Sequence, residues 1–200
     1  MVKTSDDFWK GYTLESWRTF VQHDFGNPSR EMFYKFLKEY IFFGEHSGSS
    51  FCEIGFGGAY DFKTCFKELD DRGDIRYFGI DRTEEFVEYA KTDFPGYNWE
   101  QGGFETLGER TFDITYARHI LQHAAPEVYQ DWIRAMLGAT NEMAVIVWHP
   151  KPSVEHFHYD GGWNCTYDKK TVDNLIRSLG FSIEEIPAGD EDTFYIMRIQ

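Results

Sequence analysis

A glycine-rich loop is the feature of this sequence best suited to chemistry. Residues 53–60 read Glu-Ile-Gly-Phe-Gly-Gly-Ala-Tyr, after a short apolar run and before a helical pattern. Glycines at such a junction let the backbone turn tightly and approach a ligand closely. The pattern predicts a ligand-binding loop at the carboxyl end of a strand, although a plain tight turn would look the same.

The loop does not match the pattern of a dinucleotide-binding site. That pattern is G-x-G-x-x-G, because the pyrophosphate must reach the N-terminus of the following helix. Counted from Gly55, the third glycine position is Tyr60, whose side chain is bulky. A different ligand is therefore expected.

An acidic residue follows one strand-helix-strand unit later. Asp81 ends the next expected strand, where a carboxylate can accept hydrogen bonds from both hydroxyls of a ribose. An aspartate that only caps the following turn is the alternative. The glycine loop and this acid together are more specific than either alone, and they favour an adenosyl ligand.

In motif order and strand count, residues 50–200 resemble the class I S-adenosylmethionine-dependent methyltransferases. The first motif of that family, an acid followed by G-x-G-x-G, is similar to residues 53–59, with Ala59 in place of the last glycine. The segment that contacts adenine resembles residues 101–107, but Gly103 stands where the family has an acid, which leaves Phe104 to pack on the ring. The resemblance implies S-adenosylmethionine as cofactor, held by Glu53, Gly55, Phe56, Gly57, Asp81, Arg82, Gly103, Phe104 and Ala117.

The fold expected is α/β, with a Rossmann-like, mostly parallel seven-stranded sheet. Strands and helices alternate from residue 51 onward, which predicts a sheet with helices on both faces. The last two strands, 181–186 and 193–199, have no helix between them and should form a hairpin with an antiparallel last strand. We expect one domain over 1–200, with a helical cap at 1–44 and the Rossmann-like core at 50–200.

Three histidines are candidate catalytic bases. His119 and His123 follow the fourth expected strand, whose end faces the transferred methyl group in the family, and His149 follows the fifth. A hydroxyl or acidic N–H acceptor benefits from a base that titrates near neutrality, for which histidine is the usual choice. A packing or surface role is the alternative for each of them.

The spacing of the first two histidines also suits a metal. His119 and His123 are four apart and would share a face if that segment were helical. No glutamate completes an H-E-x-x-H pattern and no third ligand is fixed, although His149, His156, His158, Asp160 and Cys165 are further donors. We expect no bound metal.

A long aromatic segment follows the fifth strand. Residues 148–163 are too many for a minimal connection, and we expect a loop that covers the substrate together with the N-terminal helices. Aromatic side chains there can bind a cation or a flat ring, or simply pack the lid on the sheet. The candidate substrate-binding residues are Tyr12, Trp17, Arg118, Tyr159 and Trp163.

The composition and net charge limit which binding partners and which compartment are expected. The net charge is −14 and no basic stripe is present, so nucleic acid is a poor partner. No apolar run in the sequence approaches the length of a membrane span or forms a secretory signal. The three cysteines form no C-x-x-C motif, which suits a reducing compartment. We therefore expect the protein to be cytoplasmic.

The function expected is methyl transfer from S-adenosylmethionine to a nitrogen or oxygen of a small molecule, with protein substrates second. The Asn-Pro-Pro-Tyr-like motif of many amine methylases of nucleic acids is absent, as is the Pro-Cys pair used against pyrimidine carbon. Two alternatives stay open. One is a binding protein that kept the fold without transfer, and the other is an enzyme that cleaves, cyclises or alkylates with the same cofactor.

Overall fold

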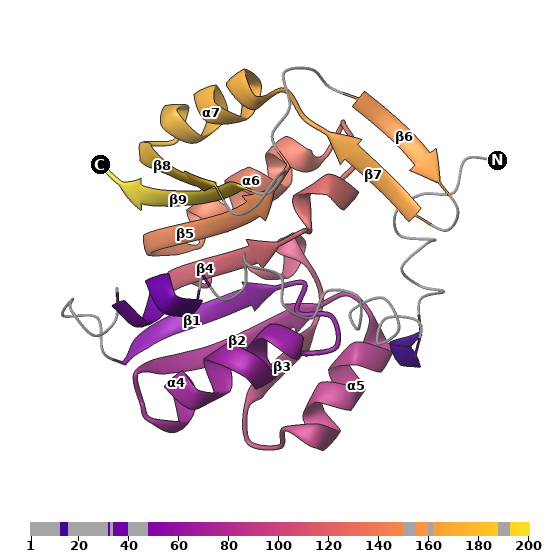
Figure 1. Cartoon of the computed structure of the whole chain (residues 1–200), viewed down its shortest axis with the longest axis vertical. Helices are drawn as coiled ribbons and strands as arrows, with labels where there is room; N and C mark the ends of the chain where they lie inside the picture. The colour runs from indigo at the N-terminus through magenta and orange to yellow at the C-terminus, as the bar shows by residue number, and fades with distance from the viewer. Residues whose placement is uncertain are drawn as a thin grey trace.

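A twisted seven-stranded sheet organises the molecule (Figure 1). The computed structural model describes residues 13–15, 32, 34–39, 48–149, 155–159, 162–187 and 193–200, without the side chains of 155–159 and 162–164. The order across the sheet is β3-β2-β1-β4-β5-β9-β8. The strands are β1 (Ser49–Ile54), β2 (Ile75–Asp81), β3 (Asn98–Gln101), β4 (Phe112–Arg118), β5 (Thr140–Trp148), β8 (Phe181–Pro187) and β9 (Thr193–Ile199).

The strand directions confirm the expected topology. β1 is parallel to β2 and β4, and β3 and β5 continue the parallel set on either side. β9 alone is antiparallel, because β8 and β9 form a hairpin and β9 pairs with β5. The order in which successive strands are added to the sheet reverses between the parallel neighbours β1 and β4, and such a switch point is where open α/β sheets bind ligands.

Helices cover both faces of the sheet (Figure 1). The aromatic and aliphatic side chains of β5 alternate between the two cores, so that Ile146 and Trp148 face one and Val145 and Val147 the other. The first core is closed by η2 (Phe104–Thr106), η3 (Leu121–His123), α6 (Tyr129–Gly138) and α7 (Lys169–Ser178), and the second by η1 (Phe62–Phe66), α4 (Lys67–Asp71) and α5 (Glu84–Asp93).

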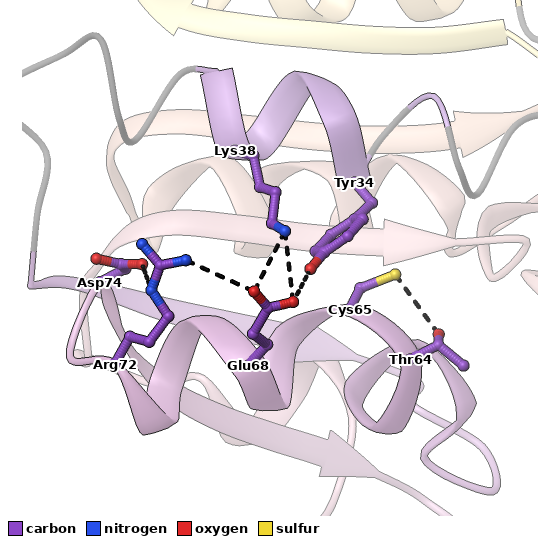
Figure 2. A network of polar contacts seen from close by, with 7 residues as sticks. All are labelled: Tyr34, Lys38, Thr64, Cys65, Glu68, Arg72 and Asp74. Carbon is purple, nitrogen blue, oxygen red and sulfur yellow. Dashed lines mark hydrogen bonds and ion pairs between the residues drawn. The ribbon is translucent and has the colours of Figure 1, made fainter.

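An N-terminal helical segment packs against the second core. Residues 34–39 are helical, and Leu37 is fully buried there. Figure 2 shows how the exposed side of this segment is tied to α4: the Tyr34 hydroxyl and Lys38 Nζ both donate to the Glu68 carboxylate, and Lys38 does so at 3.3 Å. Arg72 bridges Glu68 at 3.5 Å and Asp74 at 3.1 Å. The segment is therefore joined to the domain by the apolar packing of Leu37 and by the polar contacts to Glu68.

The long segment after β5 is not the loop expected from the sequence. It contains a two-stranded antiparallel hairpin, β6 (Glu155–Tyr159) paired with β7 (Gly162–Thr166), as a separate small sheet. Aromatic and β-branched residues favour strands, and Asp160-Gly161 is a strong hairpin-turn signal. The hairpin lies beside η3 and leads into α7 (Figure 1).

Two further sequence expectations concern cysteines and membranes. All three cysteines, Cys52, Cys65 and Cys165, are buried and not disulfide-bonded. Across the part of the chain that the structure describes, no helix combines the length and the apolar character needed to traverse a bilayer.

Candidate active site

The glycine loop leaves β1 with a left-handed turn. Gly55 has φ +75°, and its N–H donates to Ile80 O of β2 at 2.7 Å. A Cβ built on Gly55 would lie 2.3 Å from Cδ1 of Ile120, which follows β4. The left-handed backbone therefore favours glycine at 55, and a side chain there would also have to displace the end of the Ile120 side chain.

Asp81 ends β2 beneath this loop and is 7% exposed. Its Oδ2 accepts from the Gly57 N–H and its Oδ1 accepts from the Thr83 N–H, both at 2.8 Å. Burial raises the pKa of the Asp81 carboxyl, and the hydrogen bonds from Thr83 and Gly57 oppose part of that rise. Asp81 therefore does organise the turn before α5, as one alternative had it, and the Thr83 side chain also bonds to it. A carboxylate has about four acceptor positions, so room for a further donor is left.

The end of β3 lies next to Asp81. The Gly102 N–H donates to Asp81 O at 2.8 Å, which holds the two strand ends together. The side chain of Phe104 is buried and stacks on Trp132 of α6, with ring centroids 5.0 Å apart and planes 21° apart. This stacking uses one face of the Phe104 ring for packing between η2 and α6.

Glu53 and Tyr77 form the first part of a buried polar network under the loop. Glu53 is 3% exposed and accepts from the Tyr77 hydroxyl at 2.5 Å. Burial first, and the neighbouring Glu53 carboxylate second, hold the pKa of Tyr77 well above its ordinary value. Tyr77 therefore stays a donor to Glu53, the acid that opens the glycine motif.

Asp61 and Arg118 form the second part. Arg118 Nε, at the end of β4, donates to Asp61 Oδ2 at 2.9 Å, and the Tyr116 hydroxyl donates to the same oxygen at 3.2 Å. The two charged side chains are 12% and 7% exposed. Asp61 is not among the site residues predicted from the sequence. Its position directly after the glycine loop is the one feature of the sequence that points to it.

Two of the three candidate histidines lie together. His119 follows β4 with φ +54°, an uncommon backbone for a residue other than glycine, and its N–H donates to Val147 O at 3.0 Å. The rings of His119 and His149 are 5.3 Å apart. The expectation that His119 and His123 share a helical face is wrong, because His119 is left-handed and only the short 3-10 turn η3 contains His123.

The remaining predicted site residues are either buried or belong to the parts of the chain that the structure does not describe. Phe56 packs edge-on against Trp99 at 4.9 Å, and Ala117 is buried in the first core. Tyr12 and Trp17 lie outside the described residues. Tyr159 belongs to β6 and Trp163 to β7, but the structure describes only their backbone. Within the described ranges, no three His, Cys, Asp or Glu side chains are grouped as a metal site.

The chain as a whole resembles solved structures although its sequence diverges. No family model and no curated protein matches the sequence. Magnesium protoporphyrin IX methyltransferase from Synechocystis PCC 6803, with bound SAM, superposes with a TM-score of 0.76 at 15% identity, covering 100% of this chain and 99% of that one.

Two further structures agree. The 1,6-didemethyltoxoflavin-N1-methyltransferase from Burkholderia thailandensis has a TM-score of 0.69 at 13% identity, with 98% and 87% of the chains covered. A TehB-like SAM-dependent methyltransferase from Corynebacterium glutamicum has a TM-score of 0.65 at 14% identity, with 98% of both chains covered. The chain has the class I methyltransferase fold.

This methyltransferase fold explains the clustering of the candidate residues. Four of them, Gly55, Gly103, His119 and His149, follow β1, β3, β4 and β5, and Asp81 is the last residue of β2. Because those strands are parallel, all five residues gather at the carboxyl edge of one sheet, where open α/β sheets bind ligands.

Proposed function

We propose that this chain binds S-adenosylmethionine and transfers its methyl group to a nitrogen or oxygen of a small molecule. One observation carries the proposal. Asp81 is a buried carboxylate at the carboxyl end of β2, fixed by the backbone of the glycine loop and with acceptor capacity left for a ligand. A carboxylate in that state matches the paired hydroxyls of a ribose.

The residues around Asp81 fit the rest of an adenosyl ligand. The loop at Gly55 and Gly57 has no side chains to keep a ligand away from the backbone. Beneath it, Glu53 and Asp61 outnumber Arg118 in formal charge, which suits the ammonium and sulfonium charges of the ligand. Arg118, aligned by Asp61, is the group suited to a carboxylate.

When bound, S-adenosylmethionine supplies an electrophilic methyl carbon on sulfur. The chain would hold the methyl donor and the acceptor in line and exclude water from them, because an in-line displacement needs the two reactants aligned and desolvated. His119 and His149 lie side by side after β4 and β5, and in this proposal one of them accepts the proton of a hydroxyl or acidic N–H acceptor. An amine that arrives neutral would not need them.

A small-molecule acceptor is the class with the best support. The net charge of −14 opposes a nucleic-acid acceptor. Of the structures similar to this one, two are named as methyltransferases of magnesium protoporphyrin IX and of 1,6-didemethyltoxoflavin, both small ring systems. In this proposal the acceptor approaches the site beside η3, which β7 of the hairpin contacts.

Calorimetric titration with S-adenosylmethionine and S-adenosylhomocysteine, with NAD as a control, tests cofactor binding. Micromolar binding of both adenosyl ligands and none of NAD is the expected result. A screen of amines, phenols and ring N–H compounds for release of S-adenosylhomocysteine then tests transfer. Binding of NAD, or failure of both adenosyl ligands to bind, would reject the proposal.

A non-catalytic binding protein is the second candidate, because Gly103 lacks the acid that the resemblance leads one to expect. Turnover of S-adenosylmethionine to S-adenosylhomocysteine with any acceptor would exclude it. Mass spectrometry of the products separates methylation from cleavage or cyclisation of the ligand.

A further inference from the structure

Two buried polar atoms near the candidate bases have no hydrogen-bond partner. Trp148 is the last residue of β5 and is 2% exposed, and across the part of the chain that the structure describes nothing accepts from its Nε1–H. The Oε1 of Gln122, in η3, is also buried and receives no hydrogen bond from the described residues. Native proteins leave few buried polar groups unpaired, because each such group has lost its hydrogen bonds to water. The two atoms therefore need an explanation beyond the stability of the fold.

Both atoms belong to the segments that carry the candidate bases. Trp148 directly precedes His149, whose ring is 5.3 Å from that of His119. Gln122 lies three residues after His119, and η3 contacts β5. Because the His119 N–H donates to Val147 O at 3.0 Å, the chain after β4 lies against the last residues of β5. A hydrogen-bond donor and an acceptor thus flank the histidine pair, one on each segment.

Packing alone does not account for the indole of Trp148. Its ring packs edge-on against Tyr195, with ring centroids 5.3 Å apart, and belongs to the same buried cluster as Leu121 of η3. A phenylalanine would fill much of that space without burying a donor. By contrast, the buried indole of Trp99 donates its Nε1–H to Phe94 O at 3.1 Å. The unpaired N–H of Trp148 is therefore available to a ligand.

The two groups define the chemistry of a matching ligand. An indole Nε1–H only donates and an amide Oε1 only accepts, and neither is charged. A ligand that satisfies both must present an acceptor and a donor, as a carbonyl beside an N–H does, and a ring holds these two on one edge. Burial makes such a site selective, because a molecule without the matching group leaves a protein atom unpaired.

We propose that Trp148 and Gln122 select the methyl acceptor, and that this acceptor is an uncharged cyclic ureide. Its carbonyl accepts from Trp148 Nε1–H and one N–H donates to Gln122 Oε1. A ureide has a second N–H, which can take the methyl group while the first is bound. Such an N–H is weakly acidic, and the histidine pair then serves as its base. This inference rests on the proposed function.

Nuclear magnetic resonance of the indole N–H groups tests the contact with Trp148. The full chain, labelled with the heavy isotope of nitrogen and saturated with S-adenosylhomocysteine, is titrated with uracil and separately with hydantoin. The Nε1–H signal of Trp148, assigned through its contacts to the Tyr195 ring, should move downfield, because a new hydrogen bond deshields the proton. The signal of Trp99, whose N–H is already bonded, is the internal control and should stay in place.

A pair of ligands tests the contact with Gln122. N,N′-dimethyluracil keeps both carbonyls of uracil and lacks both N–H groups, so uracil should bind the natural chain about 10-fold more tightly. Gln122→Met keeps the length of the side chain without the acceptor and should bring this ratio close to one. A ratio caused by the bulk of the methyl groups would persist in that variant. Gln130→Met, at an exposed glutamine of α6, is the matched control and should leave the ratio unchanged.

The outcomes separate the two proposals. If S-adenosylhomocysteine does not bind, the proposed function fails and this inference falls with it. If S-adenosylhomocysteine binds but neither ureide at millimolar concentration moves the Trp148 signal, the ureide site is overturned and the proposed function stands. Retention of the full ratio in Gln122→Met overturns the role of Gln122 in the same way.

Discussion

The backbone N–H of Gly57 donates to Oδ2 of Asp81 at 2.8 Å, so the glycine loop and the acid after β2 are bonded to each other. The other carboxylate oxygen is held by the Thr83 N–H at the same distance. The carboxylate is therefore fixed before any ligand arrives. A ligand that uses its remaining lone pairs pays little for ordering it.

Replacing Asp81 by alanine tests this arrangement. Asp81→Ala removes two expected ribose hydrogen bonds and should weaken binding of S-adenosylhomocysteine at least ~10-fold, about 1.4 kcal/mol or more. It also leaves the buried Gly57 N–H without its acceptor, which should cost about 1 kcal/mol of folding free energy. Calorimetry measures the first effect and urea unfolding the second.

Asp93→Ala is the matched control, because Asp93 is an exposed aspartate at the end of α5. It should change neither quantity. Unaltered ligand affinity in Asp81→Ala would leave Asp81 as a turn-forming residue only.

Much of the fold could be predicted from the sequence, for a physical reason. Apolar runs that end in glycine or aspartate mark buried parallel strands, and these were found at 51–54 and 75–80 against observed strands Ser49–Ile54 and Ile75–Asp81. Because parallel strands end at one edge, placing Gly55 and Asp81 at strand ends also placed them near each other.

The contacts that depend on side-chain packing could not be predicted. The stacking of Phe104 on Trp132 and the ion pair of Asp61 with Arg118 join positions far apart in sequence. Nothing in the sequence indicates that His119 has a left-handed backbone, because residues other than glycine usually avoid that conformation. By contrast, the sequence does contain a signal for the β6–β7 hairpin. Asp160-Gly161 is a dipeptide typical of a two-residue hairpin turn.

Gly55 should not tolerate a side chain. Gly55→Ala forces a residue with a Cβ into φ +75° and against Ile120, and should cost about 2 kcal/mol or more of folding free energy. Gly138→Ala is the control, because a Cβ at the end of α6 meets no atom within 4 Å. It should be neutral or stabilising by up to about 1 kcal/mol. Equal urea midpoints for the two variants would contradict the steric account of the loop.

Asp61 and Arg118 should be energetically coupled. Removing one partner leaves the other largely buried charge without this ion pair, so Asp61→Ala and Arg118→Met should each destabilise by about 3 kcal/mol. The double variant should cost less than the sum, by about 1–3 kcal/mol, in a double-mutant cycle measured by denaturant unfolding. Additive effects would mean that the pair does not act as a unit.

Asp113 should make stability depend on acid pH. Its Oδ2 accepts from the Ser50 N–H at 2.7 Å and the Ser50 hydroxyl at 2.8 Å, joining the starts of β1 and β4. Burial acts to raise the pKa of Asp113, but the hydrogen bonds from Ser50 and Asn141 and the charge of Arg76 together outweigh it, so its folded pKa lies below the unfolded value. The stabilisation is therefore present above the unfolded value, about 3.9, and is lost as pH falls through the folded pKa.

Asp113→Asn removes the charge while keeping the size of the side chain. Its melting temperature at pH 7 should lie roughly 2–4 °C below that of the natural chain, equivalent to about 1 kcal/mol. The gap should close as pH falls below the folded pKa, because the natural carboxyl is then also neutral. Scanning calorimetry from pH 7 to pH 2.5 measures it. A gap that stays constant to the lowest pH would show that the ionised carboxylate is not what binds the two strands together.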